Sequence, residues 1–158
     1  MEHPALAFTE TLRKLSEEAY AAGEVPIAAA AYNDSGILSA CYNRTRTDRN
    51  AIQHAEMQCI AECCAQLKNE RLVGVRLISV LEPCLMCGGA IIEARIEEVI
   101  YYCPATHGPS LSDLLSDEFA ETFKKDKGIN HKPVLTHLTE LEAEFSERIR
   151  EFFRSRRT

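Results

Sequence analysis

The sequence predicts an α/β protein built around a central five-stranded mixed sheet. Five short apolar runs alternate with segments that have helical spacing, an order typical of a sheet covered by helices. The first two runs, 25–33 and 37–42, flank the turn sequence Asn33-Asp34-Ser35-Gly36, which predicts a hairpin and therefore an antiparallel pair. Because the later runs alternate with helical segments, the sheet is expected to be mixed.

The first helix is predicted over residues 8–22, where apolar side chains recur at spacings of three and four. Leu12, Leu15 and Ala19 share one face of this helix, and Gly23 is a stop signal. The run 25–33 is almost entirely apolar, so the strand that follows is expected to be buried on both faces.

The remaining elements continue the alternation. Pro83 ends one strand, and the small residues Gly88 and Gly89 allow the helix after it to approach another backbone closely. The segment 104–130 has the weakest pattern, a loop followed by a helix over 111–125 and a turn at Gly128. The other predicted helices cover 55–67, 84–94 and 141–156, and the other predicted strands cover 75–81, 99–103 and 133–139.

Length and composition favour a single domain over residues 1–158, with 46% hydrophobic residues to form its core. The longest apolar run, Val25–Tyr32, is far shorter than the roughly 20 residues of a membrane-spanning helix. The N-terminus also lacks a basic segment followed by an apolar run. We therefore expect a cytoplasmic protein that does not enter the membrane.

The seven cysteines favour a reducing compartment over a disulfide framework, because their number is odd and two have the spacing of metal ligands. Cys41, Cys59, Cys63 and Cys103 lie in apolar strand or helix patterns. We expect these four to be small buried hydrophobic residues.

The formal net charge of −6 argues against general nucleic-acid binding, which depends on basic contacts to phosphates. Residues 148–157, however, hold five arginines against one glutamate, so any RNA contact is expected to be localised. The alternative for each arginine is a solvated position on a terminal helix that packs Phe152 and Phe153 inward. The candidates for RNA-backbone contact are Arg148, Arg150, Arg154, Arg156 and Arg157.

One imidazole and two thiols have the spacing of a zinc site. Cys84 and Cys87 are three residues apart at a predicted helix start, so both sulfurs can reach one ion, and the helix dipole favours their thiolate forms. His54 adds a neutral third ligand and leaves a fourth position for water, the arrangement of a catalytic zinc. A structural site would need a further ligand, and His107, His131 or His137 remains open for that role.

Glu56 is the candidate proton shuttle. It can share the site with His54 only if that histidine caps a helix and Glu56 lies in the first helical turn. Zinc lowers the pKa of its water to roughly 7, and a nearby carboxylate can then carry protons to the substrate's ring and to the departing amine. The alternative is a solvated first-turn carboxylate favoured by the helix dipole. His-x-Glu followed by Pro-Cys-x-x-Cys is typical of zinc-dependent base deaminases.

With these motifs the chain resembles the bacterial tRNA-specific adenosine deaminases of the cytidine deaminase superfamily. The resemblance implies a three-layer α/β/α cytidine-deaminase-like fold, one zinc ion per subunit and a homodimer. It assigns His54, Cys84 and Cys87 to the metal and Glu56 to proton transfer. The similar segments are Glu24-Val25-Pro26-Ile27, Tyr42-Asn43-Arg44, Leu81 to Ala90, Asn130-His131 and the arginine-rich ending after Phe152-Phe153.

The resemblance further assigns Asn43, Ile27 and Ala55 to the substrate pocket. An amide such as Asn43 can donate to N7 of adenine while accepting from its amino group, although a turn residue ending a strand is the alternative. This sequence departs from the family pattern at Ile27-Ala28-Ala29, at 50–53 and at 102–108. The loop that contacts the nucleotide is therefore expected to differ.

The leading hypothesis is hydrolytic deamination of adenosine to inosine at the wobble position of tRNA, with zinc-bound water as nucleophile and ammonia released. The substrate would be a tRNA anticodon stem-loop with its base flipped into the pocket. A deaminase of small free bases or nucleosides, such as guanine or cytosine, is the alternative that the acidic net charge and the altered loop favour. A noncatalytic zinc-stabilised binding module is a third possibility, and the presence of Glu56 argues against it.

Overall fold

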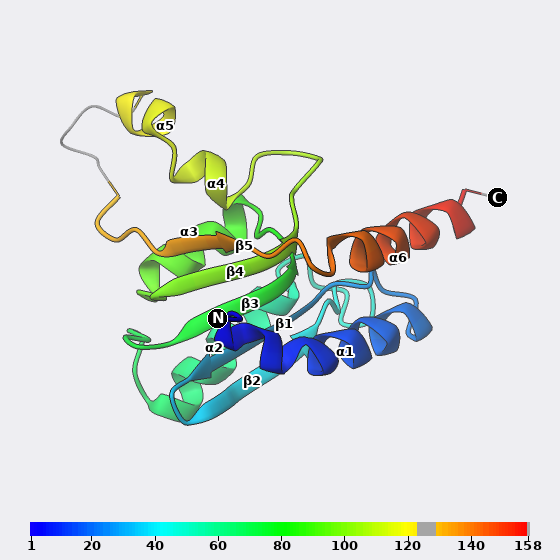
Figure 1. Ribbon diagram of the computed structural model, residues 1–158, viewed down its shortest axis with the longest axis horizontal. Coiled ribbons are helices and arrows are strands. Elements are labelled where there is room, and N and C mark those ends of the chain that lie inside the picture. The colour runs from blue at the N-terminus through cyan, green and yellow to red at the C-terminus, as the bar shows by residue number, and fades with distance from the viewer. Residues whose placement is uncertain (123–128, 158) are drawn as a thin grey trace.

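The computed structural model describes residues 1–122 and 129–157 and contains a five-stranded sheet in the order β2-β1-β3-β4-β5 (Figure 1). Strand β1 pairs antiparallel with β2 and with β3, whereas β3, β4 and β5 are parallel. The predicted mixed sheet is confirmed. The strands are β1 Ala28–Asn33, β2 Gly36–Tyr42, β3 Arg76–Leu81, β4 Glu98–Cys103 and β5 Val134–His137.

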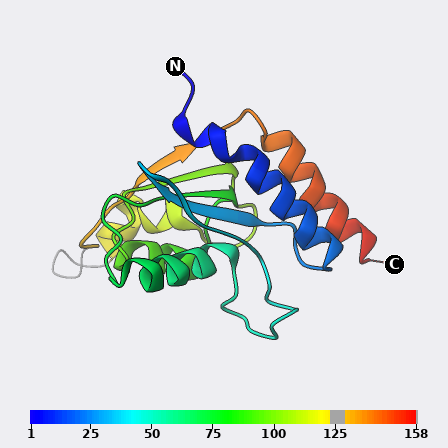
Figure 2. The same cartoon turned by 90° about the horizontal axis from the view of Figure 1, so that it is seen from below.

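Helices cover both faces of the sheet. Figure 2 shows α1 and α6 side by side on one face and α2 and α3 on the other, so the three-layer α/β/α fold is confirmed. In the part of the chain that the structure describes, no helix combines the length and the hydropathy needed to cross a membrane. The helices are the 3-10 helix η1 Pro4–Phe8 and the α-helices α1 Thr9–Ala21, α2 Ala55–Leu67, α3 Leu85–Glu93, α4 Leu111–Leu114, α5 Asp117–Thr122 and α6 Glu142–Ser155.

Side-chain alternation along β1 divides the interior into two cores. Ala28 and Ala30 belong to the core beneath α1 and α6, whereas Ala29 and Ala31 belong to the core beneath α2 and α3. All four alanines are fully buried, so the predicted burial of this strand on both faces is confirmed.

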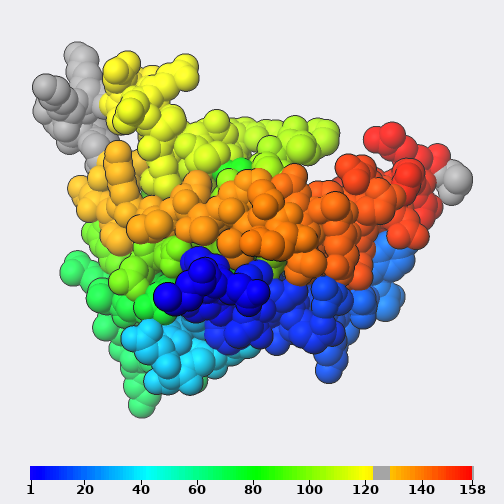
Figure 3. Space-filling view, viewed as in Figure 1, coloured from blue at the N-terminus to red at the C-terminus, as the bar shows by residue number. Residues whose placement is uncertain are grey.

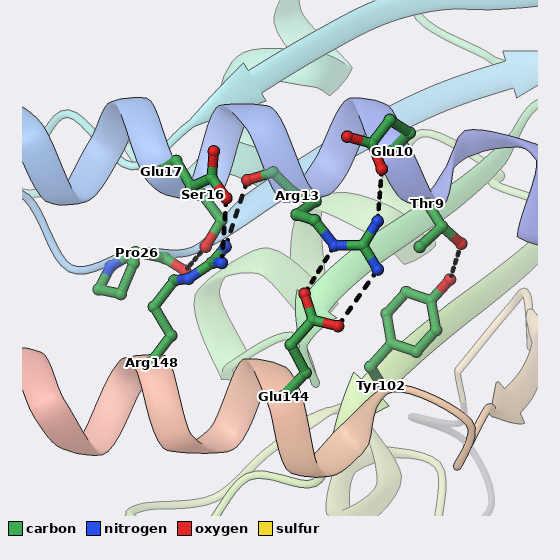
Figure 4. A network of polar contacts seen from close by, with 9 residues as sticks. All are labelled: Thr9, Glu10, Arg13, Ser16, Glu17, Pro26, Tyr102, Glu144 and Arg148. Carbon is green, nitrogen blue, oxygen red and sulfur yellow. Dashed lines mark hydrogen bonds and ion pairs between the residues drawn. The ribbon is translucent and has the colours of Figure 1, made fainter.

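Helix α6 is fastened to α1 by charged side chains (Figure 4). The Arg13 guanidinium donates to Glu144 over 2.6 Å, and the Arg148 guanidinium donates to Glu17 over 3.2 Å and to the backbone oxygen of Arg13 over 3.3 Å. Ser16 then donates to the backbone oxygen of Pro26 over 2.8 Å. These contacts fix the C-terminal helix against the segment that leads into β1.

Two predicted boundaries are wrong. Strand β1 begins at Ala28 rather than at Val25, because Pro26 has no N–H for a ladder and Ile27 N donates to Val25 O over 2.7 Å in a tight turn. In place of one helix over 111–125 the structure has the short α4 and α5. They are separated at 115–116, where the Ser116 hydroxyl bonds to backbone groups. Residues 123–125 and Gly128 lie outside the described residues.

The prediction that small residues allow a close approach of the helix after Pro83 is confirmed at Gly88 and wrong at Gly89, where an added Cβ would have no described neighbour within 4 Å. An added Cβ at Gly88 would lie 3.3 Å from side-chain atoms of Leu111 and Leu114, which explains why α3 and α4 can pack closely there. All seven cysteines are free thiols, and Cys41, Cys59, Cys63 and Cys103 are buried.

Candidate active site

The site forms where helices α2 and α3 begin. His54 immediately precedes α2 and Cys84 immediately precedes α3, and both have extended backbones, with ψ of 151° and 176°. Pro83 separates β3 from α3, so Cys84 lies just beyond the end of the strand. Unpaired N–H groups and the positive dipole end at each helix start favour anionic groups there.

Three metal-binding atoms converge at these helix starts. The donor atoms of His54, Cys84 and Cys87 lie within 4.8 Å of one another. His54 Nδ1 is 3.7 Å from Cys84 Sγ and 3.5 Å from Cys87 Sγ. A tetrahedral zinc with ordinary Zn–N and Zn–S bonds separates such ligands by about 3.5 Å, so the donor set fits zinc.

The surroundings of Cys84 favour its thiolate form. Hydrogen bonds from Cys87 and His54 lower the pKa of Cys84 to about 3. The contact with Cys84, together with burial, raises the pKa of Cys87. The contact with Cys84 also raises the pKa of His54, although burial acts against it. A thiolate held between a second thiol and an imidazole is a strong ligand for a divalent cation.

Glu56 lies in the first turn of α2 and points into the site. The Ser79 hydroxyl donates to Glu56 Oε1 over 2.9 Å, and Cys87 Sγ is 3.7 Å from Glu56 Oε2. Only 4% of this residue is exposed, and burial raises its pKa. His54 caps helix α2 and Glu56 lies in its first turn. This is the geometry that the sequence requires if both side chains are to reach the same site. A solvated carboxylate is excluded by the burial.

None of the three histidines that could have closed the metal site is grouped with its donor atoms, although His107 lines the same cavity. His131 Nε2 bonds to the backbone oxygen of Ile96 over 2.6 Å, and His137 Nε2 bonds to that of Tyr102 over 2.9 Å. His107 bonds to its neighbour Thr106. The described residues therefore bring together three side chains that could bind a metal, the number typical of a catalytic zinc.

A cavity of about 750 Å³ opens over Glu56 and the metal-binding residues. Ile27, Asn43 and Ala55 line it, as the sequence predicted for the substrate pocket. Residues 105–107 and the end of α6 form its far walls, and Figure 3 shows the surface hollowed between the loop after β4 and the red end of that helix. The volume is ample for a purine nucleoside.

Sequence reasoning missed Glu24, which fixes the loop on one side of the cavity. The residue is fully buried, and its Oε1 accepts from the backbone N–H groups of Arg46 and Thr47 over 2.9 and 2.6 Å. Its Oε2 accepts from Asn43 Nδ2 over 3.4 Å. A lone carboxylate at the start of an apolar run was the available signal.

Glu82, also missed, fixes the opposite loop. It accepts from Ala105 N over 3.1 Å, from the Ser110 hydroxyl over 2.8 Å and from Ser112 N over 2.9 Å. Burial acts to raise the pKa of Glu82, but the hydrogen bonds from Ser112, Ser110 and Ala105 hold it below its usual value. Its position directly before Pro83-Cys84 was the available signal.

The five arginines proposed for RNA contact separate into two groups. Arg148 pairs with Glu17 on α1, and Arg156 donates to the backbone oxygen of Gly23 over 3.1 Å and lies over the Phe152 ring. These two hold the helix in place. The arginines that line the cavity are Arg150, Arg154 and Arg157, of which Arg150 and Arg154 both pair with Glu147 of the same helix.

Comparison with known proteins agrees with this geometry. Residues 3–103 match the model of the cytidine and deoxycytidylate deaminase zinc-binding region. The tRNA-specific adenosine deaminase of Aquifex aeolicus (strain VF5) is 31% identical over 155 residues, which cover 95% of this chain and 94% of that protein. The protein of that name from Bacillus subtilis (strain 168) is 40% identical over 88 residues, which cover 56% of this chain and 55% of that protein.

Solved structures point to the same group. A structure from studies of A-to-I editing by tRNA:A34 deaminases has a TM-score of 0.77 at 30% identity and covers 90% of this chain and 99% of that chain. Guanine deaminase from Bacillus subtilis has a TM-score of 0.60 at 24% identity, covers 96% of this chain and 95% of that chain, and supports the fold alone. The donor set and the matched region identify zinc as the cofactor. The chain therefore belongs to the zinc-dependent deaminases of the cytidine deaminase superfamily, in the branch of the tRNA-specific adenosine deaminases.

Proposed function

We propose that this protein converts adenosine to inosine at the wobble position of a tRNA anticodon, with water consumed and ammonia released. The observation that carries the proposal is the three-ligand metal site beside a buried carboxylate, at the base of a cavity lined by arginines. The full-length relative from Aquifex aeolicus bears the name of this activity. The metal-binding residues and the carboxylate of this site support the deamination chemistry, and the arginines that line its cavity support an RNA substrate.

His54, Cys84 and Cys87 hold the zinc ion, which when bound supplies the Lewis acidity that activates water for attack on the purine ring. Glu56 accepts a proton from that water and delivers protons to the ring nitrogen and to the departing amine. The raised pKa of Glu56 suits a group that must both take and return a proton. Ser79 holds one carboxylate oxygen, which leaves the other toward Cys87 and the cavity.

The base binds between Ile27, Ala55 and Asn43, which line the cavity around Glu56. The apolar side chains contact the faces and edges of the ring, and the Asn43 amide pairs with the base edge that carries N7 and the amino group. The RNA backbone lies against Arg150, Arg154 and Arg157 at the mouth of the cavity. Glu147 pairs with Arg150 and Arg154, and the three arginines together still exceed that one carboxylate in charge.

A deaminase of a small free base is the second candidate, and a specific observation favours it. The net charge is −6, and two of the five terminal arginines are bound to the protein's own α1 and its following turn. A small substrate needs no basic surface. On this alternative, replacing the arginines at the cavity mouth leaves turnover unchanged.

The deciding experiment measures ammonia release and inosine formation with an anticodon stem-loop that has adenosine at the wobble position, and with free guanine and cytosine. We expect inosine from the stem-loop and no turnover of the free bases. Turnover of a free base with none of the stem-loop would contradict the proposal. A protein that holds zinc but releases no ammonia from any of the three would support a noncatalytic binding module.

We also propose that the protein acts as a homodimer in the cytoplasm, with residues 1–158 as one catalytic domain. Exposed apolar side chains at Ile52, Leu67 and Leu85, at or near α2 and α3, favour association through that layer. Seven free thiols are consistent with a reducing compartment. Light scattering of the purified protein tests the dimer, and a monomeric mass at micromolar concentration would contradict it.

A further inference from the structure

The Asn43 side chain makes one defined hydrogen bond and leaves the rest of its amide to the cavity. Its Nδ2 donates to Glu24 Oε2 over 3.4 Å, and its backbone N donates to the Ile27 backbone oxygen over 2.9 Å. Among the described residues, no group donates a hydrogen bond to Asn43 Oδ1. This oxygen remains accessible to solvent, and Asn43 lines the cavity. Oδ1 is therefore available to accept a hydrogen bond from a molecule in the cavity.

The direction of that amide is set by Glu24. A carboxylate accepts hydrogen bonds and does not donate them, so the amide nitrogen of Asn43 must be the atom that faces it. Glu24 itself cannot turn, because it is fully buried and its other oxygen accepts from the backbone N–H groups of Arg46 and Thr47. The protein thereby fixes which corner of the amide is donor and which is acceptor before the substrate arrives.

We propose that Glu24 is a positioning residue that orients the Asn43 amide to match the edge of adenine. One N–H of Asn43 is occupied by Glu24, and the groups left for the base are Oδ1 and the second N–H. This pair is complementary to the amino donor and the N7 acceptor of adenine. The inference rests on the proposed function, because it takes adenine as the base that Asn43 meets.

Replacing Glu24 by glutamine reverses the amide without removing the loop anchor. The oxygen of the introduced glutamine must remain on the two backbone N–H groups, which can only donate, so its NH2 group lies where Oε2 was. A donor then faces the Asn43 Nδ2 donor, and the Asn43 amide turns over to offer Oδ1 to that NH2 group. The substrate would meet a donor where it needs an acceptor.

The experiment compares the wild-type protein, Glu24→Gln, Asn43→Asp and the double variant, with kcat and KM measured on the anticodon stem-loop and the unfolding midpoint measured for each. Glu24→Gln should lower kcat/KM roughly 10- to 100-fold, the size expected when a bidentate base contact is removed. Its unfolding midpoint should stay within a few degrees of the wild-type value because the backbone anchor persists. Glu62→Gln changes a carboxylate that does not line the cavity, accepts from Ser39, and serves as the matched control.

Asn43→Asp alone brings two carboxylates together and should be the more damaging single change. In the double variant the introduced glutamine donates to the introduced aspartate, which again offers an acceptor to the base. The kcat/KM of the double variant should therefore be at least about tenfold above that of Asn43→Asp. If Glu24 served folding alone, the losses in kcat/KM of the two single variants would add up in the double variant.

Equal activity of Glu24→Gln and the wild-type protein, or a double variant no better than Asn43→Asp, would overturn the inference. If Glu24→Gln does not fold, a folded double variant supports the direct pairing and an unfolded one refutes it. A wild-type protein that leaves the stem-loop unchanged defeats the proposed function itself. An active wild-type protein with the wrong variant pattern defeats the inference alone.

Discussion

The zinc end of the cavity and its rim are built in different ways. The zinc end, formed by His54, Glu56, Cys84 and Cys87, comes from two short motifs at the starts of α2 and α3. The rim, formed by Asn43, Thr45, residues 105–107 and the end of α6, comes from three segments that are distant in sequence. Single buried carboxylates, Glu24 and Glu82, fix the two loops. The proposed reactive groups thus lie at or beside helix starts, whereas the rim combines two loops, each held by one buried carboxylate, with the end of helix α6.

The largest effect is expected from loss of a metal ligand. Cys87→Ser replaces a buried thiol by a hydroxyl that binds zinc weakly, so the zinc content should fall to background and deamination should be abolished. Elemental analysis of the dialysed protein and the inosine assay measure both. Cys64→Ser, which changes a half-buried thiol outside the site, should keep full zinc and activity. Full zinc in Cys87→Ser would contradict the assigned ligand set.

The next largest effect is expected at Glu56, the proposed proton shuttle. Glu56→Gln keeps the size of the side chain but cannot accept and return a proton, so kcat should fall on the order of 10²- to 10⁴-fold. Zinc content should remain that of the wild-type protein, because Glu56 is not among the three grouped ligands. Single-turnover kinetics together with elemental analysis test this. Retained turnover would assign proton transfer to another group.

A smaller effect, confined to RNA substrates, is expected at the rim. Replacing Arg150, Arg154 and Arg157 together by alanine should raise KM for the stem-loop by at least about tenfold. The dependence of log affinity on log salt should flatten by roughly 0.7 to 0.9 for each phosphate that the protein no longer neutralises. Fluorescence anisotropy at several salt concentrations measures both.

The triple variant Lys14→Ala, Arg71→Ala, Lys132→Ala is the matched control, since it removes the same charge from exposed sites that do not line the cavity. Its KM and salt dependence should stay near those of the wild-type protein. If both triple variants weaken binding equally, the effect belongs to overall charge and not to the rim.

The smallest effect is expected at the ion pair between Arg13 and Glu144, which holds helix α6 and thereby supports the rim. The hydrogen bond from Arg13 holds the pKa of Glu144 below its usual value, so its stabilisation is present above the unfolded pKa of roughly 4.3 and is lost as the pH falls. Because this pair is partly exposed, Glu144→Gln should lower the free energy of unfolding at pH 7 by less than about 1 kcal/mol. The difference from the wild-type protein should shrink below pH 4.

Urea unfolding at pH 7 and at pH 3 measures that difference. Glu121→Gln, in the exposed part of α5, provides the control. A difference that grows as the pH falls would contradict the assigned direction of the Glu144 pKa.

The zinc end was largely predictable from the sequence because its side chains come from two short motifs. His-x-Glu and Cys-x-x-Cys fix side chains a few residues apart, and a helix start places them at known relative positions. The rim was less predictable. Arg148 has the same local signature as Arg154, yet one pairs with α1 and the other lines the cavity. The difference depends on how α6 packs, which no short pattern encodes.

The sequence by itself determined the α/β class and the mixed sheet, and it predicted that His54, Cys84 and Cys87 lie together beside Glu56, because apolar periodicity and ligand spacing are properties of neighbouring residues. Tertiary structure decided that the long predicted helix breaks into α4 and α5, which arginines face the cavity, and that Glu24 pairs with Asn43. Those outcomes depend on hydrogen bonds and packing between segments separated by tens of residues. Which residues meet in these hydrogen bonds and contacts depends on the folded arrangement of the whole chain.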